Sequence, residues 1–204
     1  MKQLTVMFVG LVCMVMAVSF AFTVMFTDAA LANPADDAEY VGYNQCQVCH
    51  SHQNSAWREM GHAEAYERLK TDEAIAIGEA LGLDRPPVEH PDCLRCHVTA
   101  YDVDLEEPPA AINLADGIQC ESCHGPSSAH IPIGRQVMFG QADIEDVDIM
   151  AGRGWPGEEN CLQCHNEESP TWRDDRYTLE DETTTGFDFE QAMEKIDHSE
   201  PDES

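Results

Sequence analysis

Four copies of the pentapeptide Cys-x-x-Cys-His occur in this chain of 204 residues and contain eight of its nine cysteines. They span residues 46–50, 93–97, 120–124 and 161–165. This pentapeptide is the attachment signal for c-type haem, in which two thiols form thioethers with one haem and the adjoining histidine binds its iron. On a helical turn, positions i, i+3 and i+4 share a face, so both sulfurs and the imidazole can meet one flat macrocycle.

The pattern therefore predicts four covalently bound haem c groups, each with its iron. Their attachment residues are Cys46, Cys49, Cys93, Cys96, Cys120, Cys123, Cys161 and Cys164, and their proximal iron ligands are His50, His97, His124 and His165.

Zinc binding and a disulfide framework are the alternative interpretations of so many cysteines. Four Cys-x-x-Cys pairs could build two zinc sites, and an even number of thiols could pair as disulfides. Neither arrangement needs a histidine directly after the second cysteine. Histidine is 9 of 204 residues, so chance alone would place one after all four pairs roughly four times in a million. The pattern favours haem.

The N-terminus has the pattern of a secretory signal. Lys2 precedes an apolar run from Leu4 to Phe26, and Ala30-Leu31-Ala32 follows as a small-residue cleavage site. We expect a signal peptide over residues 1–32 and a single tetrahaem domain over residues 33–204. The apolar run is long enough to span a bilayer, so retention as a membrane anchor remains an alternative. Cys13 lies inside this run and is interpreted as a passive apolar residue.

The formal net charge of −28 argues against nucleic acid and anionic membrane surfaces as electrostatic partners. Two interpretations of the excess of acidic residues remain. They form either a solvated acidic surface or a surface that docks onto a basic redox partner. Four haems should replace much of the ordinary core in a chain of this length. We therefore expect a mainly α fold with long loops and little or no β-sheet, whose folding depends on cofactor attachment.

Local patterns predict few regular elements. A helix is expected from Asn54 to Lys70, and a second one, capped by Thr71 or Asp72, should end near Gly82. Residues 131–159 contain five glycines without clear periodicity and are expected to be mostly loop over the haem faces. An acidic polar stretch covers residues 167–186, and the last helix is expected from Phe187 to Ile196.

The second axial site of each iron can hold histidine, methionine or nothing from the protein. A helical path from His50 to His62 is about 18 Å long, so His62 should serve another haem or none. His130 follows the third motif after Gly125-Pro126 and should also serve a different haem. His198 follows the apolar stripe of the last helix. We expect distal ligands among the histidines outside the motifs, chiefly His62, His130 and His198, with His90 as a loop residue or ligand, His52 at the surface, and Met60, Met138, Met150 and Met193 as the methionine alternatives.

At these residues the chain resembles the cytochrome c-554 family of tetrahaem cytochromes. The matching segments are Tyr40-Val41-Gly42, residues 50–62, CLRCHVTAY (93–101), GIQCESCHGP (117–126) with His130, CLQCHNEESPT (161–171) and FDFEQAMEKIDH (187–198).

This resemblance implies closely packed haems and particular axial pairs. It implies His130 opposite His50, His62 opposite His124, and His198 opposite His165. The haem of His97 would have no protein ligand on its far side, unless His90 fills that site. Residues 172–186 look like an acidic insertion relative to the family.

Three functions are compatible with this sequence. The favoured one is a periplasmic or extracellular electron carrier that exchanges electrons with redox partner proteins and is not itself an enzyme. A second is an enzyme that reduces nitric oxide or a related nitrogen species at an open haem of His97. A third is a subunit of a conductive extracellular cytochrome filament, which the high negative charge opposes unless salt screens it.

Overall fold

The fold is known from a computed structural model, which describes residues 37–143 and 156–199. The chain divides into residues 1–37 and a compact unit of residues 38–204, and the following description concerns the second unit. The predicted signal peptide lies outside the described residues, so the expected boundary after Ala32 remains a prediction. Within the described residues, no helix is both long enough and apolar enough to cross a bilayer.

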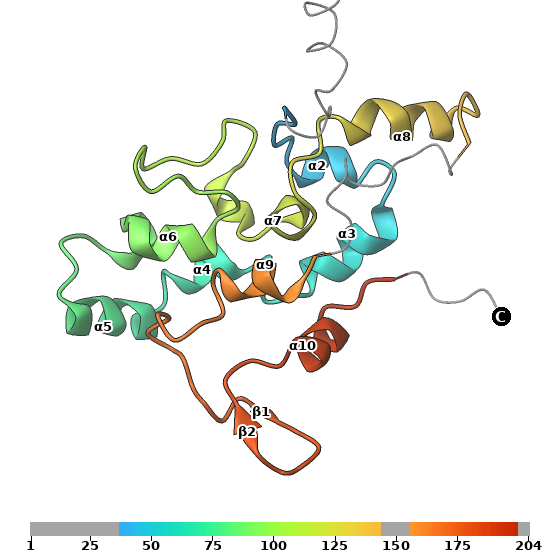
Figure 1. Ribbon diagram of the computed structural model, residues 1–204. Coiled ribbons are helices and arrows are strands. Elements are labelled where there is room, and N and C mark those ends of the chain that lie inside the picture. The colour runs from blue at the N-terminus through green and yellow to red at the C-terminus, as the bar shows by residue number, and fades with distance from the viewer. Residues whose placement is uncertain (1–36, 144–155, 200–204) are drawn as a thin grey trace, which may run out of the picture. The chain divides into compact units, whose positions relative to one another are not determined.

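The architecture is mainly α with long loops, as predicted from the sequence (Figure 1). The described β structure consists of one two-stranded antiparallel hairpin, in which Tyr177 pairs with Thr185, and an isolated bridge between Asp102 and Glu107. The α-helices are α2 (Tyr43–Cys46), α3 (Ser51–Arg58), α4 (Ala65–Arg68), α5 (Asp72–Leu81), α6 (Pro91–His97), α7 (Cys120–His124), α8 (His130–Met138), α9 (Glu158–Leu162) and α10 (Phe189–Lys195); the 3₁₀ helices are η2 (Pro87–Glu89) and η3 (Leu114–Asp116), and the strands are β1 (Tyr177–Thr178) and β2 (Thr184–Thr185).

The apolar core of the polypeptide is small. It centres on Leu94 in α6, Leu69 directly after α4, Val98 directly after α6, and Ile112 in the loop before η3. The largest side chains that are almost fully buried include the polar Gln119 and Glu121 alongside Val98 and Thr99. A chain of this length that buries so little apolar surface needs other stabilising contacts, as expected if bound haems supply much of the core.

The predicted helix from Asn54 to Lys70 is wrong, because the chain turns between α3 and α4. The carbonyl of His62 accepts a hydrogen bond from Ile118 N at 3.0 Å, and the Trp57 indole donates to Ile118 O at 2.8 Å. These long-range bonds fix the turn beside the segment that leads into α7. His62 consequently lies in a turn and not on a continuous helix.

Gly117 permits the close approach of these two segments. Its φ is +61°, and a Cβ at this position would lie 2.6 Å from His62 O and 3.0 Å from Ala63 O. A side chain cannot fit there, and the left-handed backbone is unfavourable for residues other than glycine. The position of His62 therefore depends on a glycine in the third haem segment.

The sequence patterns succeed for α5 and α10. Thr71 caps α5 by accepting a hydrogen bond from Ala74 N, and Gly82 ends it in the left-handed conformation. Asp188 caps α10 by accepting from Gln191 N. Each cap satisfies a backbone group that the helix itself leaves unpaired.

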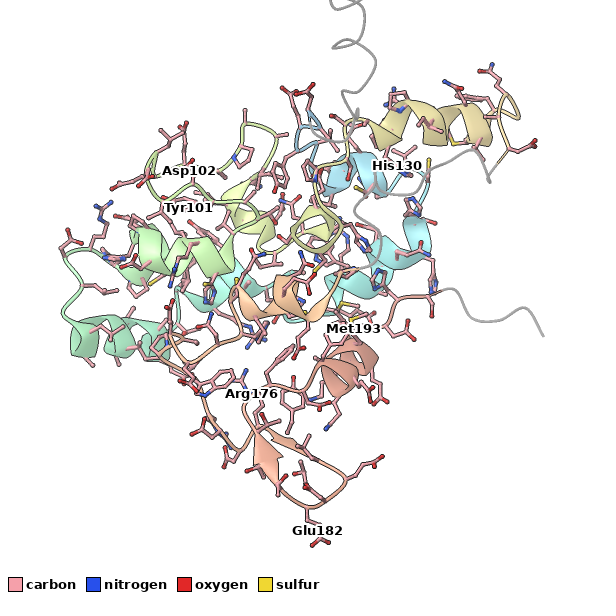
Figure 2. The ribbon with its side chains drawn as sticks, viewed as in Figure 1. Tyr101, Asp102, His130, Arg176, Glu182 and Met193 are labelled. Carbon is pink, nitrogen blue, oxygen red and sulfur yellow. The ribbon has the colours of Figure 1, made fainter. Side chains whose placement is uncertain are left out.

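The expectation of mostly loop over residues 131–159 is wrong for α8. Pro132 and Gly134 disfavour a helix interior, but Pro132 lies in the first turn of α8, where its missing N–H costs no intrahelical bond. Residues 144–155 of the same stretch lie outside the described residues. The acidic stretch before α10 contains the β1–β2 hairpin, with Glu182 at the tip of its loop (Figure 2).

Candidate functional site

Each Cys-x-x-Cys-His motif lies on or directly beside a short helix. The first begins at the end of α2, the second ends α6, the third forms α7, and the fourth begins in α9. In the first and fourth motifs, the histidine N–H donates to the carbonyl of the first cysteine at 2.9 Å, as in a helical turn. The eight cysteines of the motifs are all free thiols. These sulfur atoms are the ones that would form thioether bonds with attached haems.

Six histidine rings form three close pairs. The rings of His50 and His130 are 6.2 Å apart between centroids, with 26° between their planes. His62 and His165 are 6.0 Å apart at 75°. His124 and His198 are 6.0 Å apart at 83°. Each pair joins one motif histidine to one of the three histidines predicted from the sequence as distal ligands.

This spacing is that of two ligands on opposite sides of one metal. Each metal–nitrogen bond is about 2 Å long and the imidazole centre lies about 1 Å beyond the nitrogen, which gives roughly 6 Å between centroids. Direct packing of two rings does not require the same distance three times. The residues present therefore fit three haem irons that are each bound by two histidines.

The protonation of these histidines fits the same role. Burial lowers the pKa values of His62 and His130 below the ordinary range of histidine. Burial also lowers the pKa values of His124 and His165, and neighbouring histidines add to the effect. An imidazole must be neutral to donate a lone pair to a metal. The Nδ1 atom of His130 is also buried without a hydrogen-bond partner among the described residues, as a nitrogen that awaits a metal would be.

Two of the three ring pairs differ from the axial pairs that the family resemblance implied. The implied pair of His50 with His130 agrees with the structure. His62 lies against His165 and not His124, whereas His198 lies against His124 and not His165. The turn after α3 determines the place of His62, and the C-terminal end of α10 carries His198.

The His124 side of the site contains a small cavity of about 60 Å³, partly open to solvent. Gln119 lies in its wall and has a buried Nε2 atom without a hydrogen-bond partner among the described residues. The cavity is lined by Trp57, Met60, His62, Ile118, Gln119, Cys120, Cys123, His124, Pro156, Met193, Ile196 and His198.

His97 differs from the other motif histidines because no second histidine ring pairs with it among the described residues. Its Nδ1 lies 2.6 Å from the carbonyl oxygen of Ala65, to which the protonated nitrogen donates. This bond leaves Nε2 for a metal and fixes the orientation of the ring.

The alternative in which His90 serves the haem of His97 is not supported by the structure. Nδ1 of His90 accepts a hydrogen bond from Asp92 N at 3.3 Å, and Nε2 lies 3.5 Å from an oxygen of Asp84. Both nitrogens therefore face groups of their own loop, where His90 caps α6. His52 is exposed on α3, as expected.

The motifs approach one another in a definite order. The thiols of Cys46 and Cys120 are in hydrogen-bonding contact, as are those of Cys96 and Cys164. Cys123 is close enough to Cys161 for an electrostatic interaction. The first motif therefore adjoins the third, the third adjoins the fourth, and the fourth adjoins the second.

Sequence reasoning missed a buried carboxylate inside the third motif. Glu121 is 1% exposed and accepts hydrogen bonds from the N–H groups of Val41, Gly42 and Ser127. These bonds join the N-terminal segment to α7 close to Cys46 and Cys120. The available signal was an acidic residue between the two cysteines, a position that solvent exposure would equally explain.

Comparisons with known proteins identify similar cytochromes. The family model described as cytochrome c554 and c-prime matches residues 45–125. The chain is similar to cytochrome c-554 of Nitrosomonas europaea, with 26% identity over 189 residues that cover 84% of this chain and 79% of that protein. It also resembles the solved structure of reduced cytochrome c554 from Nitrosomonas europaea, with 25% identity, a TM-score of 0.45 and 78% of each chain covered.

Proposed function

We propose that this chain, which is similar to cytochrome c-554 and matches the cytochrome c554 family model over residues 45–125, is a tetrahaem electron carrier of the periplasm with four covalently bound haem c groups. Transfer of electrons is the activity of such multihaem c-type cytochromes, and haem iron supplies it by one-electron oxidation and reduction. We further propose that it carries four electrons, that each of three irons has two histidine ligands, and that the four haem sites follow one another in a fixed order.

The observation that carries the proposal is the threefold repetition of a histidine pair at 6.0–6.2 Å. In each pair the two imidazoles hold one iron from both sides and exclude a substrate from it. An iron with two histidine ligands exchanges electrons without binding a substrate. Three such sites favour an electron carrier over an enzyme.

The contacts between motifs support an electron path along the whole chain. The path runs from the site of His50 to that of His124, then to His165 and finally to His97. It follows the contacts between Cys46 and Cys120, between Cys123 and Cys161, and between Cys96 and Cys164. The sites of His50 and His97 are its two ends, where redox partners would exchange electrons with the protein.

The net charge of −28 supports partners with a basic docking surface and disfavours nucleic acid. Periplasmic location rests on the signal-like pattern of residues 1–32 and on the chemistry of haem c, which is attached outside the cytoplasmic membrane. A protein whose N-terminal apolar run is retained would be a membrane-anchored carrier with the same sites.

A second candidate function is reduction of a small nitrogen oxide at the haem of His97. The observation that favours it is the absence of a second histidine ring beside His97 among the described residues. A site with one protein ligand can bind a small molecule. Transfer along the path would then supply the electrons for that reduction.

A coulometric titration of the purified protein tests the carrier function. We expect four electrons per chain and full reoxidation by an outer-sphere oxidant in the absence of any nitrogen substrate. Fewer than four electrons per chain would contradict the proposal. Catalytic consumption of nitric oxide by the reduced protein, abolished when carbon monoxide occupies the open iron, would favour the second function.

A further inference from the structure

The ring of Phe187 stacks on the imidazole of His165. Their centroids are 5.8 Å apart and their planes are inclined by 25°. Phe187 lies between β2 and α10, directly after the stretch that looks like an insertion relative to the family. A nearly parallel ring at this distance packs against one side of the imidazole, and this ring–ring contact favours the present orientation of the imidazole.

Phe187 is itself held in place from behind. The ring of Tyr177, in β1, meets Phe187 edge to face at 6.1 Å and 77°. Tyr177 is buried, at 8% exposure, and α10 packs against its strand. Lys195 Nζ lies 4.0 Å from the centre of the tyrosine ring, and Gln191 Nε2 donates to Thr178 O at 3.0 Å.

The base of the hairpin leaves little freedom for Phe187. Trp172 packs directly on Gly186, the residue before Phe187, so that a Cβ at Gly186 would overlap the indole ring. Thr185 Oγ1 donates to Phe187 O at 3.1 Å. Figure 2 shows Arg176 at the base of the hairpin and Glu182 at its tip. The hairpin thus presents an aromatic base to the fourth motif and an acidic tip to solvent.

We propose that Phe187, supported by Tyr177, is a positioning residue that fixes the rotation of the His165 imidazole relative to His62. This inference rests on the proposed function, because it requires His165 and His62 to hold the same iron. Residues outside the first ligand sphere commonly set the orientation and basicity of a metal-bound histidine. Here the aromatic ring of Phe187, at the base of the hairpin, sets the orientation of the haem ligand His165.

The angle between the two imidazole planes makes this role measurable. The planes of His62 and His165 are inclined by 75°. In a ferric haem with two histidines, nearly perpendicular planes leave two iron d orbitals almost equal in energy, whereas parallel planes separate them. Perpendicular planes therefore give an electron paramagnetic resonance signal with a large maximum g value. Rotation of His165 would lower that value or broaden the signal.

The test is the paramagnetic resonance spectrum of the full haem-loaded protein carrying Phe187→Leu. Leucine keeps an apolar side chain at this position but removes the flat face. We expect the large-g signal of one haem to shift or broaden, with the other signals and the haem count unchanged. Phe139→Leu is the matched control, because Phe139 is 69% exposed at the end of α8. That control should have the wild-type spectrum.

A second pair of variants identifies the affected haem. His62→Ala should remove the signal that Phe187→Leu shifts, so the double variant should show no additional change. His198→Ala should leave the effect of Phe187→Leu intact. Tyr177→Leu removes the support behind Phe187 and should cause a smaller shift of the same signal. It also provides the test if Phe187→Leu cannot be produced.

The outcomes separate this inference from the proposed function. Four haems and wild-type spectra in both Phe187→Leu and Tyr177→Leu would overturn the positioning role while leaving the carrier intact. A shift in a signal that survives in His62→Ala would also overturn it. If His62→Ala changes no haem signal at all, His62 is not a ligand and the proposed ligation itself is wrong.

Discussion

The imidazole rings of His50 and His130 are nearly parallel, at 26°, whereas the other two histidine pairs are nearly perpendicular. If each pair holds an iron, the oxidised protein should contain two classes of low-spin haem. We expect one signal with ordinary rhombic g values and two with a large maximum g value in its electron paramagnetic resonance spectrum. A single class of low-spin signal would contradict the ring geometry.

Replacement of a distal histidine should open its iron to small ligands. In His198→Ala the haem of His124 loses its second ligand, because His198 is the ring 6.0 Å away. The reduced variant should bind two molecules of carbon monoxide per chain, about twice the number that the wild type binds. His52→Ala is the matched control, since His52 is exposed and outside every pair. A variant that binds no additional carbon monoxide would show that His198 is not a ligand.

Removal of the buried charge of Glu121 should raise the reduction potentials of the neighbouring haems. A carboxylate in a poorly hydrated site stabilises the ferric state of a nearby iron, and Glu121→Gln removes its charge while nearly keeping its shape. It should also cost about 1.5–3 kcal/mol of folding stability for each lost charge-assisted hydrogen bond that the amide cannot replace. Potentiometric titration and thermal unfolding measure the two effects.

Glu182→Gln provides the control for Glu121→Gln. Glu182 lies in the exposed loop of the hairpin, where water and salt screen its charge. It should change neither the potentials nor the unfolding temperature appreciably. Equal effects of the two substitutions would mean that general net charge, and not the buried position, determines the potentials.

Gly117→Ala should disturb the turn that carries His62. Both the left-handed backbone and the 2.6 Å approach of a Cβ to His62 O oppose the substitution, so we expect destabilisation of more than about 2 kcal/mol. Gly140→Ala has a similar φ, +66°, but a Cβ there meets nothing within 4 Å. It should cost only about 1 kcal/mol.

The unfolding temperature and the spin state of the haem of His165 report the effect. Gly117→Ala should lower the unfolding temperature and add a high-spin component, and Gly140→Ala should only lower the temperature slightly. If the two variants behaved alike, the close approach to His62 would have no consequence.

The acidic charge should govern the rate of electron exchange with small redox reagents. We expect oxidation by cationic cobalt complexes to slow down as salt is added, and oxidation by ferricyanide to accelerate. Stopped-flow rates between low and physiological ionic strength test this. Rates independent of salt for both reagents would indicate that the charge lies away from the haem edges that exchange electrons.

The attachment sites were predictable from the sequence because they depend on local spacing. Helix α5 was predictable for the same reason, since Thr71 and Gly82 mark its two ends. Most of the core was not predictable from the sequence. Haem takes the place of apolar side chains there, so the periodicity of apolar residues no longer indicates which residues are buried. The turn at His62 depends on hydrogen bonds to Ile118, which no local pattern contains.

The axial pairs could be predicted only in part. The three histidines that pair with motif histidines were predicted from the sequence as a set, but which motif histidine each one meets depends on where α10 and the turn after α3 lie in space. The contribution of Phe187 was hidden for another reason. Its sequence position suggests the apolar face of a helix, whereas the structure places it before α10 and against His165.

The central claim is that three irons have two histidine ligands and the iron of His97 has one. The most direct test is carbon monoxide titration of the fully reduced wild-type protein, with the haem count fixed by the pyridine haemochrome of the same sample. The account predicts four covalent haems and one bound carbon monoxide per chain. A different haem count, no bound carbon monoxide, or more than one per chain would contradict it.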